Sequence, residues 1–428
     1  MRRGSRARVS TCGTEELTFV SLLKACAHKK DLVKGTKLHA HIMQKGLLTE
    51  RPYIASTLIS MYAKCGMLSK AQHVLENLPS RDIVSWSALI SGYAQKGQGN
   101  QAIKCFSQMQ SEGLSPNEFT FSGLLKACGS IRALEKGKEI HNEIVGRGFL
   151  EKNTILGNAL VDMYAKCGVL SEAKQVFEWI PKRDLVSWSA IIAGYAHQGQ
   201  GHLALNFFAQ MLREGISPNE ITLSCILKAC GSIRDIQKGE EIHEEIVGRG
   251  LLESNIVLGN ALVDMYAKCG VLSKAQQVLE QLPVRDVVTW NAIITGYSQQ
   301  EQGHQALECF ARMQNEGFTP DEVTLICILR ACGSVGSIEK GKQIHNEIMN
   351  GNSAKTNILL ATALVDMYAK CGVLVKAQEV LKEMTHRDTV AWNALIAGYV
   401  QHEHGHEALD CFALMQREGL SPNEVTFL

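Results

Sequence analysis

The amino-acid sequence predicts an all-α protein, an α-solenoid superhelix of about twelve helix-turn-helix repeats. Three observations support this prediction. A unit of 102 residues recurs four times in tandem, and each unit divides into three segments of 31 to 36 residues. Within the segments, the apolar residues follow helical spacing instead of alternating.

The 102-residue period is visible in strings that return almost unchanged. The string MYAKCG begins at Met61, Met163, Met265 and Met367. We therefore divide the chain into an N-terminal segment, 1–15, and a tandem array over 16–423. Residues 424–428 are interpreted as the truncated start of one more repeat.

Each unit holds a long, a short and a standard segment. In the second unit these are residues 118–153, 154–184 and 185–219, which are 36, 31 and 35 residues long. The short segment places apolar side chains at i, i+3, i+4 and i+7, namely Leu160, Met163, Tyr164 and Cys167. All eight prolines lie between hairpins. Because a lone hairpin cannot cover its apolar stripe, we expect neighbouring hairpins to stack.

Composition excludes several classes of protein. The chain is 45% hydrophobic and 20% charged with a net charge of +1, and no apolar run is long enough to span a membrane. The near-neutral charge does not favour a non-specific nucleic-acid binder. Of the 14 cysteines, none forms a C-x-x-C pair, so we predict reduced thiols, no metal site and no cofactor.

One motif resembles part of a catalytic site. His141, His243 and His345 are each followed two residues later by a glutamate, which is half of a zinc deaminase signature. That chemistry also needs two thiolate ligands from a C-x-x-C, which the chain lacks. We interpret these histidines as packing residues and predict that the chain is not an enzyme.

The N-terminal segment, 1–15, has two interpretations. It carries Arg2, Arg3, Arg6 and Arg8 and no acidic residue before Glu15. This composition is typical of an organelle transit peptide. The alternative is that the sequence starts within a longer protein.

The repeat phrases identify a resemblance. Strings such as LLKACGSIRALEKGKEIH, GNALVDMYAKCG and DLVSWSAIIAGYA, together with the order of the repeat lengths, resemble plant pentatricopeptide repeat proteins of the PLS subclass. The resemblance covers residues 16–428. It implies that the array binds single-stranded RNA along a groove lined by the first helix of each hairpin, with about one base per repeat.

In this family the fifth and last residues of a repeat read the base edge. The resemblance implies these pairs in the standard repeats: Ser87 with Asn117, Ser189 with Asn219, Asn291 with Asp321, and Asn393 with Asn423. In the short repeats it implies Ser56 with Asp82, Asn158 with Asp184, Asn260 with Asp286, and Thr362 with Asp388. The alternative for all of them is helix capping and turn chemistry.

By the family's pattern, Ser/Asn resembles an adenine reader, Asn/Asp favours uracil, Thr/Asp favours guanine, and Asn/Asn accepts either pyrimidine. The long repeats stay unread, because fifth residues such as Val20 and Ile326 cannot hydrogen-bond a base. The implied RNA is N-G-A-N-U-A-N-U-U-N-G-Y, in which N is any base and Y a pyrimidine.

The second residue of a repeat wedges beside the base in this family. Here the resemblance implies Val84, Val186, Val288 and Val390 in the standard repeats, and Tyr53, Ile155, Val257 and Leu359 in the short ones. The alternative is that these apolar residues belong to the core.

Four lysines lie two helical turns beyond the fifth residue of the short repeats, on the same helix face. They are Lys64, Lys166, Lys268 and Lys370. We expect them to contact phosphates, which would add affinity without sequence information. The alternative is that they are solvated surface lysines.

The resemblance implies a sequence-specific factor in the mitochondrion or chloroplast that serves C-to-U RNA editing. The expected partner is single-stranded organellar RNA. A deaminase or other editing factors would come from another chain or from sequence beyond residue 428, and no membrane partner is expected. The alternative function is a helical-repeat scaffold for protein–protein contacts.

Overall fold

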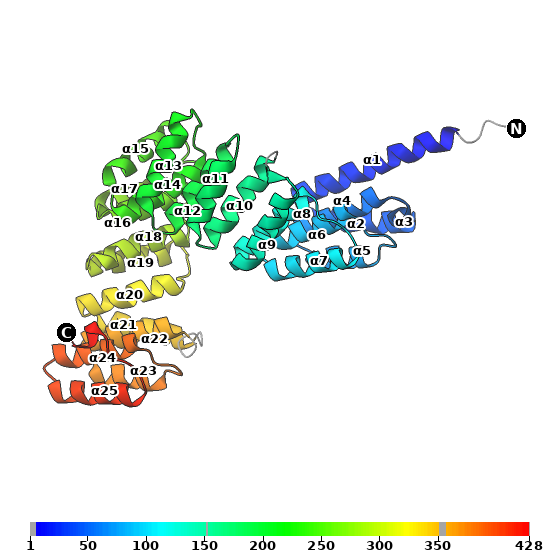
Figure 1. The fold of residues 1–428 in the computed structure, drawn as a ribbon. Helices are drawn as coiled ribbons and strands as arrows, with labels where there is room; N and C mark the ends of the chain where they lie inside the picture. The colour runs from blue at the N-terminus through cyan, green and yellow to red at the C-terminus, as the bar shows by residue number, and fades with distance from the viewer. Residues whose placement is uncertain (1–5, 151–152, 351–356, 428) are drawn as a thin grey trace. The chain divides into compact units, whose positions relative to one another are not determined.

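The computed structural model describes residues 6–150, 153–350 and 357–427, which form helices and loops without any strand (Figure 1). The chain forms two compact units, Met1–Thr222 and Leu223–Leu428. Among the residues that the structure places, no helix has both the length and the apolar character needed to cross a lipid bilayer.

The helices of the first unit have bounds close to those expected from the repeats. They are α1(Arg6–Lys29), α2(Leu32–Gln44), α3(Leu47–Glu50), α4(Pro52–Lys64), α5(Leu68–Glu76), α6(Ile83–Gln95), α7(Gly99–Ser111), α8(Glu118–Ile131), α9(Leu134–Gly146), α10(Thr154–Lys166), α11(Leu170–Trp179), α12(Leu185–His197) and α13(Gly201–Arg213). The next helix, α14(Glu220–Ile233), spans the boundary between the units.

The second unit continues the same alternation. Its helices are α15(Ile236–Gly248), α16(Ile256–Lys268), α17(Leu272–Gln281), α18(Val287–Gln299), α19(Gly303–Asn315), α20(Glu322–Val335), α21(Ile338–Asn350), α22(Ile358–Lys370), α23(Leu374–Glu383), α24(Thr389–Gln401), α25(Gly405–Arg417) and α26(Glu424–Phe427).

The helices come in consecutive pairs within the predicted repeats, except that the short helix α3 follows the first pair, and α26 starts at Glu424, where the sequence analysis places the start of one more repeat. The N-terminus differs from the sequence pattern. Helix α1 starts at Arg6, ahead of residue 16, where the pattern places the start of the array. Residues 1–5 of the N-terminal segment lie outside the described residues.

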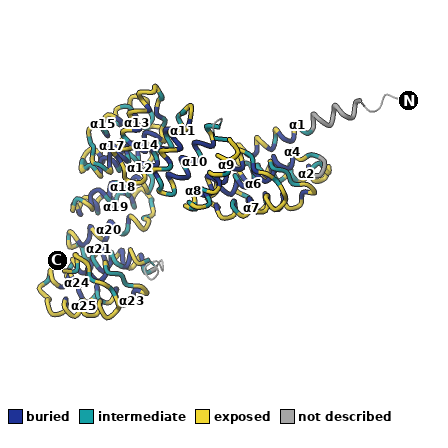
Figure 2. The backbone as a smooth tube through the Cα atoms, viewed as in Figure 1, coloured by how far each residue is buried: buried dark blue, intermediate teal, exposed yellow. Residues whose placement is uncertain are grey.

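The helices of each unit form two layers. First helices pack on first helices, in the series α4, α6, α8, α10 and α12 and again in the series α16, α18, α20, α22 and α24. Each second helix packs on its own first helix, and many also contact the next one. Buried residues therefore gather where the helices meet (Figure 2). Stacking of this kind makes each repeat depend on its neighbours.

Small residues let neighbouring first helices approach closely. A Cβ atom at Gly194 of α12 would lie 2.6 Å from the Cβ of Ala165 on α10. The same contact recurs between Gly92 and Ala63 in the first unit and between Gly296 and Ala267 in the second. The spacing of the first helices therefore requires glycine at this position.

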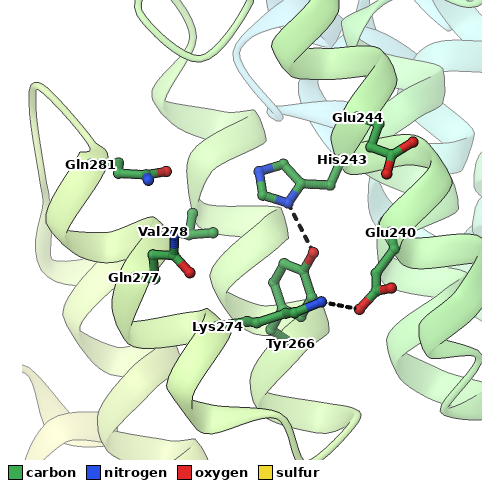
Figure 3. Close-up of a pocket in the computed structure, with 8 residues that line it drawn as sticks. All are labelled: Glu240, His243, Glu244, Tyr266, Lys274, Gln277, Val278 and Gln281. Atoms are coloured by element: carbon green, nitrogen blue, oxygen red, sulfur yellow. Dashed lines mark hydrogen bonds and ion pairs between the residues drawn. The ribbon is translucent and has the colours of Figure 1, made fainter.

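The predicted packing histidines connect a second helix to the next first helix. The Nδ1 atom of His243 on α15 lies 2.8 Å from the hydroxyl oxygen of Tyr266 on α16, and Figure 3 shows the two side chains facing each other. Lys274 of α17 forms an ion pair with Glu240 beside them. Glu245, the glutamate of the deaminase-like motif, pairs with Arg249 instead. The described residues contain no group of three potential metal ligands.

We expect Gly194→Ala to lower the free energy of unfolding by about 1–3 kcal/mol, because the added methyl group would overlap Ala165. Gly146→Ala is the matched control. Gly146 is also helical, and a Cβ atom there would meet nothing within 4 Å, so we expect little change or a slight gain. Urea unfolding of both variants measures the difference. Equal stability would contradict the close-packing argument.

The histidine contacts predict a loss of stability in mild acid. Burial lowers the pKa of His243 below its ordinary 6.5, and Lys274 lowers it further. The unfolded chain therefore binds a proton below pH 6.5 that the folded chain does not, and stability falls as the pH drops through this window. Unfolding midpoints at about pH 7.5 and 5.5 should differ less in a His243→Gln variant than in the unmodified chain. Identical pH dependence would exclude His243 as a contributor.

Candidate nucleic-acid interface

The last residue of each short and standard repeat is also the N-cap of the next first helix. Its side-chain oxygen accepts a hydrogen bond from the backbone N–H of the third residue of that helix, in every repeat that the sequence analysis singled out. The residues are Asp82, Asn117, Asp184, Asn219, Asp286, Asp321, Asp388 and Asn423. The capping alternative therefore holds for these residues, but it does not exclude a second role.

Four of the eight predicted fifth residues, all of them asparagines, lie against these caps. The Nδ2 atom of Asn158 lies 3.1 Å from the Asp184 carboxylate, and that of Asn260 lies 3.1 Å from the Asp286 carboxylate. In the standard repeats, the Nδ2 atoms of Asn291 and Asn393 lie 2.9 Å from the Asp321 carboxylate and the Asn423 side-chain oxygen. Each asparagine thus lies beside the residue with which the family pattern pairs it.

The other four pairs are looser. Ser87 lies 3.5 Å from the side-chain oxygen of Asn117, and Ser189 is connected to Asn219 through the hydroxyl of Thr222. No direct hydrogen bond joins Ser56 to Asp82 or Thr362 to Asp388 within the described part of the chain. The hydroxyl of Thr362 is buried and unpartnered there.

A third residue, which the sequence analysis missed, joins these pairs. The hydroxyl of Ser187, the third residue of α12, donates to the Oδ1 atom of Asn158 at 2.6 Å. Thr426 contacts Asn393 in the same way, at 2.8 Å. The signal was present in the sequence, because Ser or Thr recurs three residues after the cap and forms a capping box with it.

Hydrogen bonding lowers the pKa of two cap carboxylates, Asp184 and Asp321. Burial raises the pKa of Asp184, but hydrogen bonds from the backbone N–H of Ser187, the amide of Asn158 and the hydroxyl of Ser187 outweigh it, so the net shift is below the ordinary 3.8. The pKa of Asp321 is lowered in the same way by Thr324 and Asn291. At neutral pH these side chains are therefore hydrogen-bond acceptors only.

The second residues are apolar and yet exposed. Ile155 and Val257 are 65% and 58% exposed, whereas the next residues, Leu156 and Leu258, are 0% exposed. The other second residues named from sequence are exposed as well: Tyr53, Val84, Val186, Val288, Leu359 and Val390. The sequence analysis omitted the long repeats, whose second residues Leu17, Phe119, Ile221, Val323 and Val425 are exposed too. The core alternative is therefore wrong for these positions.

In the first unit the two classes of residue line one groove of about 700 Å³ across α1, α4, α6 and α8. Its walls include the second residues Tyr53, Val84 and Phe119 and the predicted reading residues Ser56, Ser87 and Asn117. Lys24, His28 and Lys64 line the same groove. Exposed apolar side chains, hydroxyl and amide groups, and basic side chains thus line the same groove. A site with mainly apolar walls and a few polar groups is typical of ligand-binding surfaces.

Three of the four predicted phosphate lysines form ion pairs. Lys166, Lys268 and Lys370 bind Asp162, Asp264 and Asp366 one helical turn earlier, at 2.7, 2.6 and 2.9 Å. Ser60 stands at the equivalent place before Lys64, whose ammonium group has no ion-pair partner among the described residues. Exposed ion pairs of this kind are weak, so the lysines remain able to exchange partners.

Comparison with known families matches the repeats directly. The model of the PPR repeat family matches residues 81–130, 183–232, 285–334 and 387–428. The PPR repeat model matches residues 53–83, 158–178, 260–287 and 361–388.

The chain is similar to named plant proteins along nearly its whole length. It is 36% identical to the chloroplastic pentatricopeptide repeat-containing protein At4g18520 of Arabidopsis thaliana, over 97% of this chain and 66% of the relative. It is also 36% identical to the mitochondrial pentatricopeptide repeat-containing protein At3g02330 of the same plant, over 97% of this chain and 48% of the relative. The chain thus spans between about half and two thirds of the relatives' length. Their locations agree with the organellar location expected from the sequence.

Solved structures share the fold. The crystal structure of the pentatricopeptide repeat protein PPR10 from maize matches 96% of this chain and 60% of its own, with a TM-score of 0.67 and 19% identity. The crystal structure of PPR10 in complex with an 18-nt psaJ RNA element matches with a TM-score of 0.71 and 18% identity, over 91% of this chain and 58% of that one. At this identity the likeness establishes the helical-repeat fold.

Because the second residue is exposed and the third is buried, we expect alanine substitutions at these adjacent positions to change the free energy of unfolding by very different amounts. Val257→Ala should change the free energy of unfolding by no more than about 0.5 kcal/mol, because the side chain is largely solvated. Leu258→Ala, one residue later and fully buried, should cost about 2–5 kcal/mol. Chemical unfolding of the two variants measures this contrast, and similar losses would place Val257 in the core after all.

Proposed function

Because the chain belongs to the PPR repeat family, we propose that it binds single-stranded RNA and reads one base with each short and each standard repeat. The observation that carries the proposal is the row of exposed apolar second residues beside the polar pairs. An aliphatic side chain that is left in water costs free energy, and a base packed against it would remove that cost.

The hydrogen bonding of each pair supports specific base preferences. In the Asn/Asp pairs, the carboxylate accepts and the amide Nδ2 atom donates, and Nδ2 keeps a second hydrogen. One donor beside one acceptor complements the O4 acceptor and the N3–H donor of uracil. Cytosine presents the opposite pattern at both atoms, so it should be rejected at Asn158, Asn260 and Asn291.

The Ser/Asn pairs have the reverse polarity. Ser87 and Ser189 donate their hydroxyl hydrogens to the carbonyl oxygens of Ile83 and Leu185, so each serine oxygen is left as an acceptor. The side-chain oxygen of the cap asparagine accepts from the next helix, which leaves its Nδ2 atom as a donor. An acceptor beside a donor complements the N6 amino group and the N1 atom of adenine.

We extend the proposal to the role of the whole protein. The alternation of long, short and standard repeats supports the PLS subclass and a function as the site-recognition factor for C-to-U editing in a mitochondrion or chloroplast. We propose that a deaminase or another editing factor acts on the RNA that the array holds, since the described residues hold no cluster of metal ligands of the kind that zinc deaminases use. The named lysines would contact phosphates by exchanging their aspartate partners.

The experiment measures binding of the purified chain to a labelled RNA with the register N-G-A-N-U-A-N-U-U-N-G-Y, at fixed, near-physiological salt. A scrambled RNA and the same sequence as DNA are the comparisons. We expect selective binding to the matched RNA. Equal, weak binding to all three would overturn base reading and favour the protein–protein scaffold.

Asp184→Asn tests the base assignment. It replaces the acceptor of the first uracil-type pair, so the preference for uracil over cytosine opposite Asn158 should fall roughly tenfold, which corresponds to about 1.4 kcal/mol. Asp162→Asn is the matched control, because it makes the same charge change in an ion pair outside the reading pairs. An equal effect of both variants would assign the result to charge alone.

A further inference from the structure

We propose that the third residue of each following first helix is a positioning residue for base selection, and that its hydroxyl fixes the orientation of the asparagine that reads the preceding base. This inference rests on the proposed function. It concerns Ser187, Thr289, Thr324 and Thr426, which belong to the repeat after the one whose base they help to select.

The pair formed by Asn260 and Asp286 illustrates the geometry. Asn260 donates from Nδ2 to the two carboxylate oxygens of Asp286, at 3.1 and 3.3 Å. Its Oδ1 atom accepts a short hydrogen bond, of 2.5 Å, from the hydroxyl of Thr289. Thr289 is fully buried, so this hydroxyl has no water to donate to. The amide is thus held at both ends, by an acceptor on its nitrogen and a donor on its oxygen.

Holding both ends determines which base edge is accepted. A half-turn of the amide would place its oxygen against the carboxylate and its nitrogen against the hydroxyl. The amide would then present an acceptor where it now presents a donor, so it would lose its match with the O4 atom of uracil and would match the N4 amino group of cytosine, although the Asp286 carboxylate would still oppose the N3 atom of cytosine. With the hydroxyl present, the turn breaks the hydrogen bonds to Asp286 and also removes the nearer acceptor of the Thr289 hydroxyl, which would then have to donate to the Asp286 carboxylate, 3.0 Å away. Without the hydroxyl, the turn breaks only the hydrogen bonds to Asp286. The hydroxyl therefore adds to the discrimination between the two pyrimidines.

The chain itself separates this role from capping. After the last short repeat, Ala391 occupies the third position of α24, and the N-cap hydrogen bond from its backbone N–H to Asp388 still forms, at 2.9 Å. The cap therefore does not need the hydroxyl. The reading residue of that repeat is Thr362, whose buried hydroxyl lacks a partner among the described residues. In this repeat the third residue cannot donate, and the hydroxyl of the fifth residue has no hydrogen-bond partner in the described part of the chain.

The test uses two equivalent pairs in the full chain. Thr289→Val and Thr324→Val each remove one hydroxyl and keep the shape of the side chain. RNA is prepared with uracil or cytosine opposite Asn260, and separately opposite Asn291. We expect Thr289→Val to lower the uracil-to-cytosine affinity ratio about tenfold opposite Asn260 only, and Thr324→Val to do so opposite Asn291 only. Thr289→Ser, which restores the hydroxyl, should recover the ratio.

Each outcome has a distinct meaning. If the unmodified chain prefers uracil at both positions and the valine variants keep both ratios, the positioning role is overturned and base reading stands. If either valine variant lowers both ratios equally, its effect is structural and the inference is again overturned. If the unmodified chain does not distinguish uracil from cytosine at either position, the proposed base reading itself fails.

Discussion

The structure depends on one hydrogen bond repeated along the array, from the backbone N–H of the third residue of a first helix to the side-chain oxygen of the residue that ends the previous repeat. This bond starts each helix at a fixed residue and so sets where its buried face begins. It also uses one oxygen of the cap and leaves the rest of that side chain at the groove. Whether that remainder is a carboxylate oxygen or an amide nitrogen then follows from the choice of Asp or Asn.

Much of this arrangement could be predicted from sequence, because the period and the helical spacing of residues such as Leu160, Met163 and Tyr164 indicate both the hairpins and their buried faces. The exposure of Val257 could not be predicted, because apolar residues at helical spacing usually pack inward and only the stacked helices show that this position stays exposed. The third member of the reading pairs was missed for another reason. A Ser or Thr three residues after a cap is already explained by the capping box that it forms with that cap. Nothing in the sequence therefore indicates that Ser187 also contacts Asn158, which belongs to the preceding repeat.

Positive charge on the first helices of the short repeats is largely compensated within the chain. Lys166, Lys268 and Lys370 each have an aspartate one turn earlier on the same helix, which agrees with the overall net charge of +1. Lys64, with Ser60 before it, lines the groove of the first unit without such a partner. Under the proposed function, bound phosphates would compete with carboxylates for most of the lysines. Affinity would then arise more from base contacts than from general attraction to a polyanion.

The contact of Thr426 with Asn393 has a consequence for how such arrays can be divided. A boundary drawn at residue 423, where the repeat length ends, would separate the proposed reading pair of the last standard repeat from the Thr426 hydroxyl that donates to it. The transferable element is therefore not the hairpin but the joint, which includes the end of one hairpin and the first turn of the next. Duplication in steps of 102 residues copies whole joints, so new copies would inherit their base preference intact. Recombination at hairpin ends would instead create joints with mixed and altered preference.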